Sequence, residues 1–129
     1  MIPLYIQKFS LFKMSSKTSA EIVGPGVWLI LHFKSLSSSP EEFKKFTDEV
    51  KKMFPCEICI RHLEIFCKNH PFDNYKGITN REGHDIGMFQ WTWMLHNSVN
   101  IRLGKPRMDF DTAYNMYKNH TQCHSKCGI

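Results

Sequence analysis

The strongest constraint on the fold of this chain is a proline followed at once by a Cys-x-x-Cys pair, in the stretch Pro55-Cys56-Glu57-Ile58-Cys59. A proline ends the helical segment before it and leaves the two cysteines near the start of the next helix. The unpaired N–H groups and the dipole of a helix N-terminus favour an anion, so we expect one thiol to ionise easily. Cysteines at this spacing can also close into a disulfide and reopen. The chain therefore has to fold around a helix–break–helix unit that carries redox-competent thiols.

Helical spacing of apolar residues continues on both sides of the pair. Before it, Ser39-Pro40-Glu41-Glu42 is typical of a helix start and predicts a helix over about residues 40–53. The apolar face of that helix is expected to comprise Phe43, Phe46, Val50, Met53 and Phe54. After the pair, a helix is expected from near residue 56 to about residues 69–71. Its inner positions are Cys59, Leu63, Phe66 and Cys67.

The remaining periodic segments predict an all-α protein, a four-helix bundle with a short fifth helix. Gly24-Pro25-Gly26 is expected to interrupt the chain before a buried helix over about residues 27–36. A loop is expected over residues 71–84, a long helix over about residues 83–103, and a short last helix over about residues 111–119. No segment has the alternation of a convincing strand.

Composition narrows the class of protein. The 129 residues suit one domain, and an apolar fraction of 42% is enough for a real core. The net charge is +5, but lysines and arginines are scattered over amphipathic segments, which predicts a solvated basic surface and no nucleic-acid partner. No stretch reaches the roughly 18 apolar residues of a membrane span. We expect a flexible N-terminal extension over residues 1–20, one domain over residues 21–119, and a mobile tail over residues 120–129.

The five cysteines do not have the pattern of a secreted disulfide framework, so they indicate redox or metal chemistry. One alternative is a structural zinc module that uses Cys56, Cys59, Cys123 and Cys127, with His62 or His124. A thioredoxin-like fold is disfavoured, because its Cys-x-x-Cys follows a strand and the segment before Cys56 is helical.

The predicted fourth helix carries polar residues on a face that should be buried. His96, Val99 and Asn100 share that face through their i, i+3, i+4 spacing, and Asn97 lies beside it. Buried histidines and asparagines need partners, and the neighbouring tryptophans could stack on a flat ring. These features favour a planar, heteroatom-rich ligand. A zinc site would leave this group of tryptophan, histidine and asparagine residues unexplained. Arg102 and Lys105, at the end of the helix, could meet phosphates.

A third motif, Gly24…Trp28…Leu31-His32, places Trp28 and His32 on one helical face. Combined with Pro55-Cys56-Glu57-Ile58-Cys59 and with the block from His96 to Pro106, it resembles the Erv/ALR family of FAD-linked sulfhydryl oxidases. The block reads His96-Asn97-Ser98-Val99-Asn100-Ile101-Arg102-Leu103-Gly104-Lys105-Pro106. The resemblance covers about residues 22–118.

The resemblance implies an enzyme that holds FAD within the helical bundle and forms disulfides in a thiol-containing protein substrate or a downstream thioredoxin-like carrier. It implies that Cys56 is attacked by the incoming thiolate and that Cys59 lies next to the flavin. Electrons would then reach molecular oxygen and give hydrogen peroxide, and the protein would be a homodimer. The implied cofactor-binding residues are Gly24, Trp28, His32, Cys59, His96, Asn97, Val99, Asn100, Lys105 and Tyr117.

The chain also departs from the family pattern. Pro25 replaces an arginine, and Gly87 and Phe110 occupy the places expected for a structural disulfide, which leaves Cys67 as a free core thiol. These departures favour a small viral member in the host cytoplasm or the virion. A cellular member would be expected in the mitochondrial intermembrane space. The tail cysteines Cys123 and Cys127 would act as an electron shuttle, or form an intersubunit disulfide, or have no role.

Overall fold

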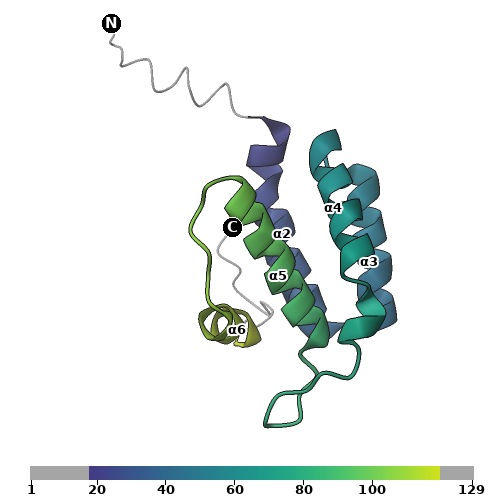
Figure 1. Ribbon diagram of the computed structural model, residues 1–129, viewed down its shortest axis with the longest axis vertical. Coiled ribbons are helices and arrows are strands. Elements are labelled where there is room, and N and C mark those ends of the chain that lie inside the picture. Colours follow the sequence, from purple (N-terminus) through teal and green to yellow (C-terminus); the bar gives the residue numbers. More distant parts are fainter. Residues whose placement is uncertain (1–17, 120–129) are drawn as a thin grey trace, which may run out of the picture.

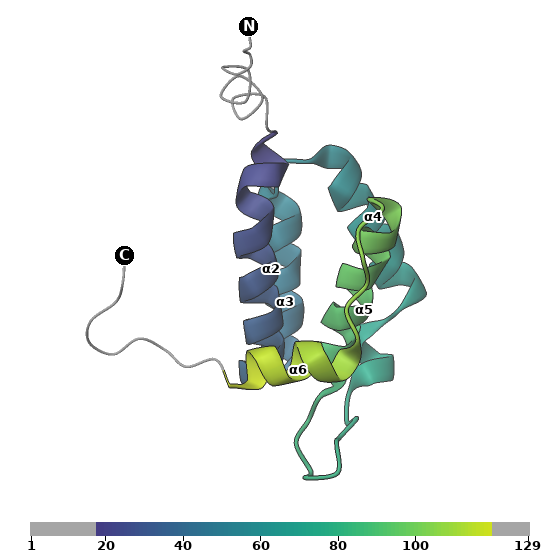
Figure 2. The ribbon, with the colours of Figure 1, turned by 90° about the vertical axis from the view of Figure 1, so that its left-hand side faces the viewer.

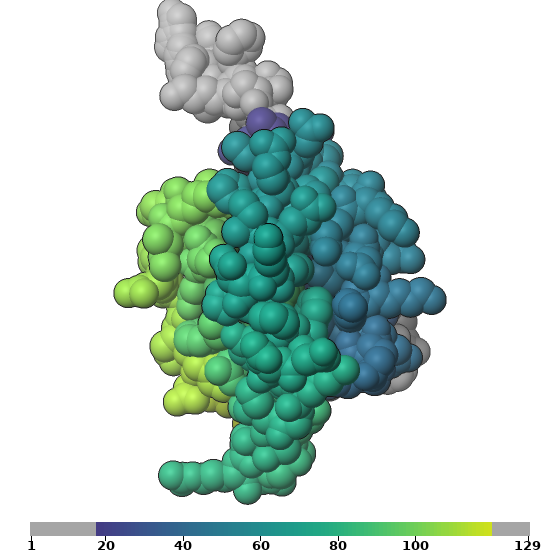
Figure 3. All heavy atoms as spheres, turned by 45° about the vertical axis from the view of Figure 1, so that its right-hand side comes forward, coloured from purple at the N-terminus to yellow at the C-terminus, as the bar shows by residue number. Residues whose placement is uncertain are grey.

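A computed structural model describes residues 18–119, and within that range the protein is all-α, as predicted. The helices are α2 (Ser19–Ser37), α3 (Pro40–Met53), α4 (Glu57–Asn69), the 3-10 helix η1 (Phe72–Tyr75), α5 (Gly87–Arg102) and α6 (Phe110–Lys118). The helices α2 to α5 run alternately up and down, and α6 lies across one end of them (Figures 1 and 2). In the space-filling view, α4 lies between α3 and the chain that forms α5 and α6 (Figure 3). None of the helices in residues 18–119 has the length and apolarity needed to span a membrane.

The helix α2 corrects the prediction of a break at Gly24-Pro25-Gly26. It runs unbroken from Ser19 to Ser37 with Pro25 inside it. The proline removes one bond of the helical ladder. Two features compensate: a capping box between Thr18 and Glu21 closes the N-terminus, and Leu31 and His32 are buried further along. Local breakers were overridden here by a cap upstream and by packing downstream.

The core is organised around Trp91 of α5, whose side chain is fully buried. Its ring lies 5.9 Å from Phe43 of α3, 5.3 Å from Phe66 of α4 and 4.4 Å from Phe72 of η1, measured between ring centroids. Its indole Nε1 donates to the carbonyl oxygen of His70 at 2.8 Å. One side chain therefore joins four elements and keeps its only polar group satisfied.

The α3 helix has the predicted bounds of residues 40–53, with Phe43 and Val50 buried. Met53 was predicted on its apolar face, and that assignment is wrong, because 68% of the Met53 side chain is exposed. Met53 is the last residue of the helix, where the chain leaves the bundle before Pro55. A position in the last turn has no neighbouring helix to cover it.

Predictions for the loop and for the start of the long helix also need correction. The predicted loop contains η1 and an isolated bridge between Thr79 and Asp85, and α5 begins at Gly87 rather than near residue 83. The backbone at Tyr75 passes so close that a Cβ at Gly87 would collide with the Tyr75 carbonyl oxygen. Glycine at this position is therefore required by the approach of η1 to α5.

The short helix α6 is attached to the bundle by aromatic contacts. Phe110 packs edge-on against Phe89 at 5.6 Å and against Trp93 at 5.4 Å, and it stacks on Tyr114 at 5.9 Å. The Tyr114 hydroxyl also accepts from the Asn80 side chain at 3.2 Å. Phe110 thus attaches α6 to the bundle by aromatic packing, at a position where the family resemblance suggested a disulfide-bonded cysteine.

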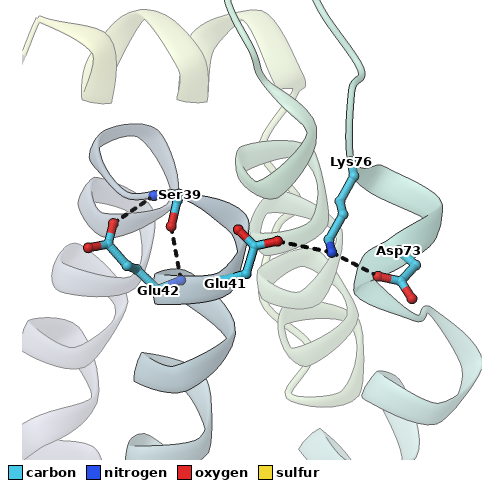
Figure 4. Close-up of polar contacts among 5 residues, drawn as sticks. All are labelled: Ser39, Glu41, Glu42, Asp73 and Lys76. Atoms are coloured by element: carbon cyan, nitrogen blue, oxygen red, sulfur yellow. Dashed lines mark hydrogen bonds and ion pairs between the residues drawn. The ribbon is translucent and has the colours of Figure 1, made fainter.

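Polar contacts fix the start of α3 (Figure 4). Ser39 and Glu42 form a reciprocal capping box, with hydrogen bonds of 3.2 and 3.0 Å. Lys76, just after η1, bridges Glu41 at 3.2 Å and Asp73 at 3.1 Å. These charged groups are exposed, so solvent screens their attraction and the bridge orients η1 more than it stabilises the fold.

Candidate functional site

The cysteine pair lies at the start of α4, as its sequence context predicted. Cys56 is the N-cap residue, and its Sγ accepts a hydrogen bond from the backbone N–H of Cys59 at 3.3 Å. The two residues are joined by a disulfide, with their Cα atoms 5.2 Å apart, and both are half-buried. The N-cap position places Cys56 Sγ next to N–H groups that would stabilise a thiolate. The site is thus suited to thiol–disulfide exchange at Cys56.

Four rings from three helices form a continuous stack. Trp28 of α2 lies parallel to His96 of α5, with centroids 3.9 Å apart and planes inclined by 4°. His96 lies 5.1 Å from His32, and His32 lies 4.5 Å from Tyr117 of α6. Residues separated by up to 89 positions along the chain therefore share one aromatic surface.

His32 and His96 form a hydrogen bond in the centre of this stack. His32 Nε2 and His96 Nδ1 are 2.8 Å apart, so one ring donates and the other accepts. Burial, followed by the effect of His96, lowers the pKa of His32 to about 3. Burial, followed by the charge of Lys105, lowers the pKa of His96 to about 4. Both rings are neutral at pH 7, and the buried His32 Nδ1 has no hydrogen-bond partner within residues 18–119.

A cavity of about 530 Å³ opens beside the stack, within the size range of small-molecule sites. It is lined by residues of α2, α5, α6 and the segment between α5 and α6. They are His32, Trp93, His96, Asn97, Asn100, Lys105, Pro106, Arg107, Met108, Asp109, Thr112, Ala113 and Tyr117. Burial raises the pKa of Tyr117, which keeps its hydroxyl neutral.

The cavity brings together six of the ten residues predicted to bind a cofactor. These are His32, His96, Asn97, Asn100, Lys105 and Tyr117. Trp28 joins them through its stack on His96. The other three, Gly24, Val99 and Cys59, are not among the lining residues.

Asn97 has a role that its spacing did not reveal. Its side-chain amide donates to the Met108 carbonyl at 2.9 Å, and its Oδ1 accepts from the Met108 N–H at 3.0 Å. The Trp93 indole donates to the same carbonyl at 2.8 Å. Both polar ends of the Asn97 side chain therefore hold the segment that follows α5.

Sequence reasoning missed the contribution of residues 106–113 to the cavity wall. The available signal was the return of the chain after Gly104, a glycine at φ +72°. A turn there brings the following residues back along α5. Trp93 also lines the cavity, and it is one of the tryptophans near His96 that were expected to stack on a flat ring.

Of the other cysteines, only Cys67 lies within the described residues, and it is not among the residues that line the cavity. Cys67 is free, as predicted, and burial raises the pKa of its thiol. Residues 18–119 contain no cluster of three or more His, Cys, Asp or Glu side chains that could hold a metal ion. The zinc alternative also needs Cys123 and Cys127, which lie outside the described residues together with the whole predicted tail, residues 120–129. Residues 1–17 of the predicted extension also lie outside them, whereas its last two residues, Ser19 and Ala20, belong to α2.

The fold and the site define a helical disulfide-exchange protein with an aromatic, cofactor-sized cavity. A family model described as "Erv1 / Alr family" matches residues 25–121, so the chain belongs to the Erv1/Alr family.

Curated relatives agree with this assignment. Sulfhydryl oxidase 1 of Oryza sativa subsp. japonica is 28% identical over 109 residues, which cover 80% of this chain and 19% of that protein. Mitochondrial FAD-linked sulfhydryl oxidase ERV1 of Saccharomyces cerevisiae is 27% identical over 96 residues, which cover 69% of this chain and 47% of that protein. The matched region thus spans less than half of either relative.

The neutral histidine pair predicts acid sensitivity of the chain without bound ligand. Unfolding frees both histidines to take up protons below pH 6.5, whereas in the folded chain they stay neutral down to about pH 4 and about pH 3. The contribution of these two histidines to the free energy of unfolding should therefore be at its maximum above pH 6.5. As the pH falls toward 4.5, it should decrease by up to about 1.4 kcal/mol per pH unit for each histidine.

Urea unfolding between pH 7 and pH 4.5 measures this slope. His32→Phe should reduce this slope by the contribution of about one proton, because only His96 of the pair then remains to take up a proton on unfolding. An identical slope in His32→Phe and the natural chain would contradict the linkage.

Proposed function

We propose that this chain is an FAD-linked sulfhydryl oxidase, which oxidises pairs of thiols in protein substrates to disulfides and passes the electrons to molecular oxygen. The observation that carries the proposal is the Cys56–Cys59 disulfide at the start of α4, in a bundle that also contains the aromatic cavity. Family membership and the printed names of the yeast and plant relatives support it.

The residues present fit FAD. A flat, nitrogen-rich ring system matches the stacked rings, and a ligand group in the cavity could satisfy the orphaned His32 Nδ1. The amide of Asn100 and the ammonium of Lys105 line the same cavity. When bound, FAD supplies the two-electron acceptor that reoxidises the cysteine pair and reduces oxygen to hydrogen peroxide.

We assign the cofactor-binding roles to the residues that the family resemblance implies. Trp28, His32, His96, Asn100 and Tyr117 would hold the rings, and Lys105 the phosphates. Asn97 would act by holding the cavity wall. Gly24, Val99 and Cys59 complete the assignment, although they are not among the residues that line the cavity.

The exchange chemistry uses Cys56 as the attacked sulfur. A substrate thiolate displaces Cys59 and forms a mixed disulfide with Cys56. The second substrate thiolate then attacks the substrate sulfur, which releases the substrate disulfide and leaves Cys56 as a thiolate. The N–H of Cys59 lies 3.3 Å from Cys56 Sγ and would stabilise that leaving group. Two electrons thereby pass from the substrate to the enzyme, and the disulfide bond passes from the enzyme to the substrate.

Replacement of Cys59 by serine tests this assignment. Cys59→Ser should abolish oxygen uptake with a dithiol substrate, because no disulfide can form with Cys56, while visible absorbance should show that FAD remains bound. Cys67→Ser is the matched control, since Cys67 is free and outside the cavity, and it should keep its turnover. Unchanged oxygen uptake in Cys59→Ser would refute the role.

The tail cysteines Cys123 and Cys127 are proposed to carry electrons from a protein substrate to Cys56. Replacing both by serine should slow the oxidation of a reduced protein more than that of a small dithiol, which can reach Cys56 directly. The two rates are measured by oxygen consumption in the same preparation. Equal slowing of both substrates would remove the shuttle from the scheme.

We also propose that the protein is a homodimer that uses the outer face of α2. Ile22, Leu29 and Ile30 recur at helical spacing and are exposed by 66%, 44% and 47%. An apolar stripe of this kind is typical of an interface. Analytical ultracentrifugation should give twice the chain mass for the natural protein and a monomer for Ile30→Glu. A monomeric natural chain would end this proposal.

Viral origin is a further proposal, and it is supported by the sequence departures alone. Pro25, His62 and the absence of cysteine at positions 87 and 110 are the features that favour a small viral member. The relatives reported above are from rice and yeast, and they do not bear on this point. Isolation of the coding sequence from a cellular genome, outside any integrated virus, would refute it.

A further inference from the structure

The lining of the cavity has two chemically different parts. One part consists of the neutral rings of His32 and His96 together with Tyr117. The other part is the segment that follows α5, which contributes Lys105 and Arg107. These two are the only Lys or Arg side chains among the lining residues, so the positive charge of the lining comes from that one segment.

Neither cation is neutralised by a neighbour in residues 18–119, where the ion pairs involve other lysines. The one acidic residue of the lining, Asp109, is already engaged. Its carboxylate caps α6 by accepting from the Thr112 N–H at 3.0 Å and from the Thr112 hydroxyl at 2.6 Å. The α6 N-terminus therefore binds its own side chain, and an anion in the cavity would be attracted to Lys105 and Arg107.

The backbone around Arg107 is anchored on both sides. The Lys105 N–H donates to the Asn100 carbonyl at 2.8 Å, and Met108 is held by its two bonds to Asn97. Arg107 thus projects from a short segment whose ends are both attached to α5. An attached segment lowers the entropy lost when a side chain grips a ligand.

Arg102 occupies a different position. It is the last residue of α5, it is exposed, and it is absent from the cavity lining. Its place in the sequence made Arg102 a candidate for phosphate binding. The turn at Gly104 brings Arg107, and not Arg102, to the wall of the cavity. The two arginines are five residues apart, and only one of them lines the site.

We propose that Arg107, together with Lys105, binds the diphosphate of the dinucleotide cofactor, and that Arg102 does not. This inference rests on the proposed function, because it assumes that the cavity takes FAD. A guanidinium presents paired donors that match phosphate oxygens, and Lys105 adds a second positive charge from the same wall. Arg107 would then distinguish dinucleotides from flavins that lack phosphate.

The test compares FAD with riboflavin, which has the same ring system and no phosphate. The full-length chain, freed of flavin, is titrated with each compound, and binding is followed by quenching of flavin fluorescence. Arg107→Ala should weaken FAD binding by about 10- to 100-fold, since a hydrogen bond to a charged group contributes about 1.5–3 kcal/mol. Riboflavin binding should not change.

Two further variants sharpen the comparison. Arg102→Ala, the matched control, should bind FAD as the natural chain does. Arg107→Lys should recover part of the loss, because it restores the charge without the paired donors. In parallel, Arg107→Ala holoprotein should lose more FAD than Arg102→Ala during gel filtration at high salt, and circular dichroism verifies that both variants are folded.

The possible failures are distinguishable. Equal FAD affinity in Arg107→Ala and Arg102→Ala would overturn the inference and leave the proposed function intact. Equal weakening of FAD and riboflavin in Arg107→Ala would also overturn it, because the arginine would then act on the shape of the cavity. A natural chain that binds neither flavin would overturn the proposed function itself.

Discussion

The hydrogen bond between His32 and His96 is the interaction on which the arrangement of the site depends. It joins α2 to α5 at 2.8 Å, and each ring continues a stack, toward Trp28 on one side and Tyr117 on the other. Between two neutral imidazoles, one ring can donate its N–H to the unprotonated nitrogen of the other, whereas two charged rings would repel each other. Burial that keeps both rings neutral is thus what allows three helices to meet at one surface. The same burial leaves His32 Nδ1 without a hydrogen-bond partner in residues 18–119, and a buried polar atom of this kind is uncommon in proteins unless a ligand or water meets it.

Elsewhere in residues 18–119, the helices are connected by aromatic packing and not by disulfides. Trp91 links α3, α4, η1 and α5, and Phe110 holds α6 against Phe89 and Trp93. The Cys56–Cys59 bond joins residues only three positions apart in the sequence, so it adds little to the connection between helices. Its reduction would therefore leave the bundle intact. A redox-active pair requires this property, because the fold has to tolerate both oxidation states of the pair.

Helix positions could be predicted where local signals and burial agree, and α3 is the clearest case. Ser39, Pro40 and Glu42 set its start, and Pro55 limits its end, so its bounds match the sequence prediction. The prediction failed at Pro25. The Thr18-x-x-Glu21 pattern of the capping box is a local signal that was not weighed against Gly24-Pro25-Gly26, whereas the burial of Leu31 and His32, which carries the helix through, depends on packing that no local signal reports. The prediction also failed near Gly87, where the start of α5 is decided by a backbone contact with Tyr75 that is twelve residues away.

The site shows the same division between local and distant information. His96, Asn100 and Lys105 were found from helical spacing, because they share one helix and the turn that follows it. The distinction between Arg102 and Arg107 was not accessible, since it depends on how the chain folds back after Gly104. Asn97 was assigned to the cofactor from the family resemblance, and it does line the cavity, but its side-chain amide is engaged with the Met108 backbone. Spacing predicts on which face of a helix a residue lies, and only the packed structure shows which other groups contact that face.

The topology relates the cavity to the cysteine pair. The helices α4 and α5 run in opposite directions, so the start of α4, with Cys56 and Cys59, and the end of α5, with Asn100, lie at the same end of the bundle (Figure 1). The helix α6, which carries Tyr117, lies across the other end (Figure 2). The cavity lining therefore extends along α5, from the α6 end toward the end that carries the disulfide. An elongated ligand suits such a site, because the lining residues follow α5 and continue along the segment after it. The up-and-down order of the helices, rather than any single motif, is what brings the Cys-x-x-Cys pair and the end of α5 to the same end of the bundle.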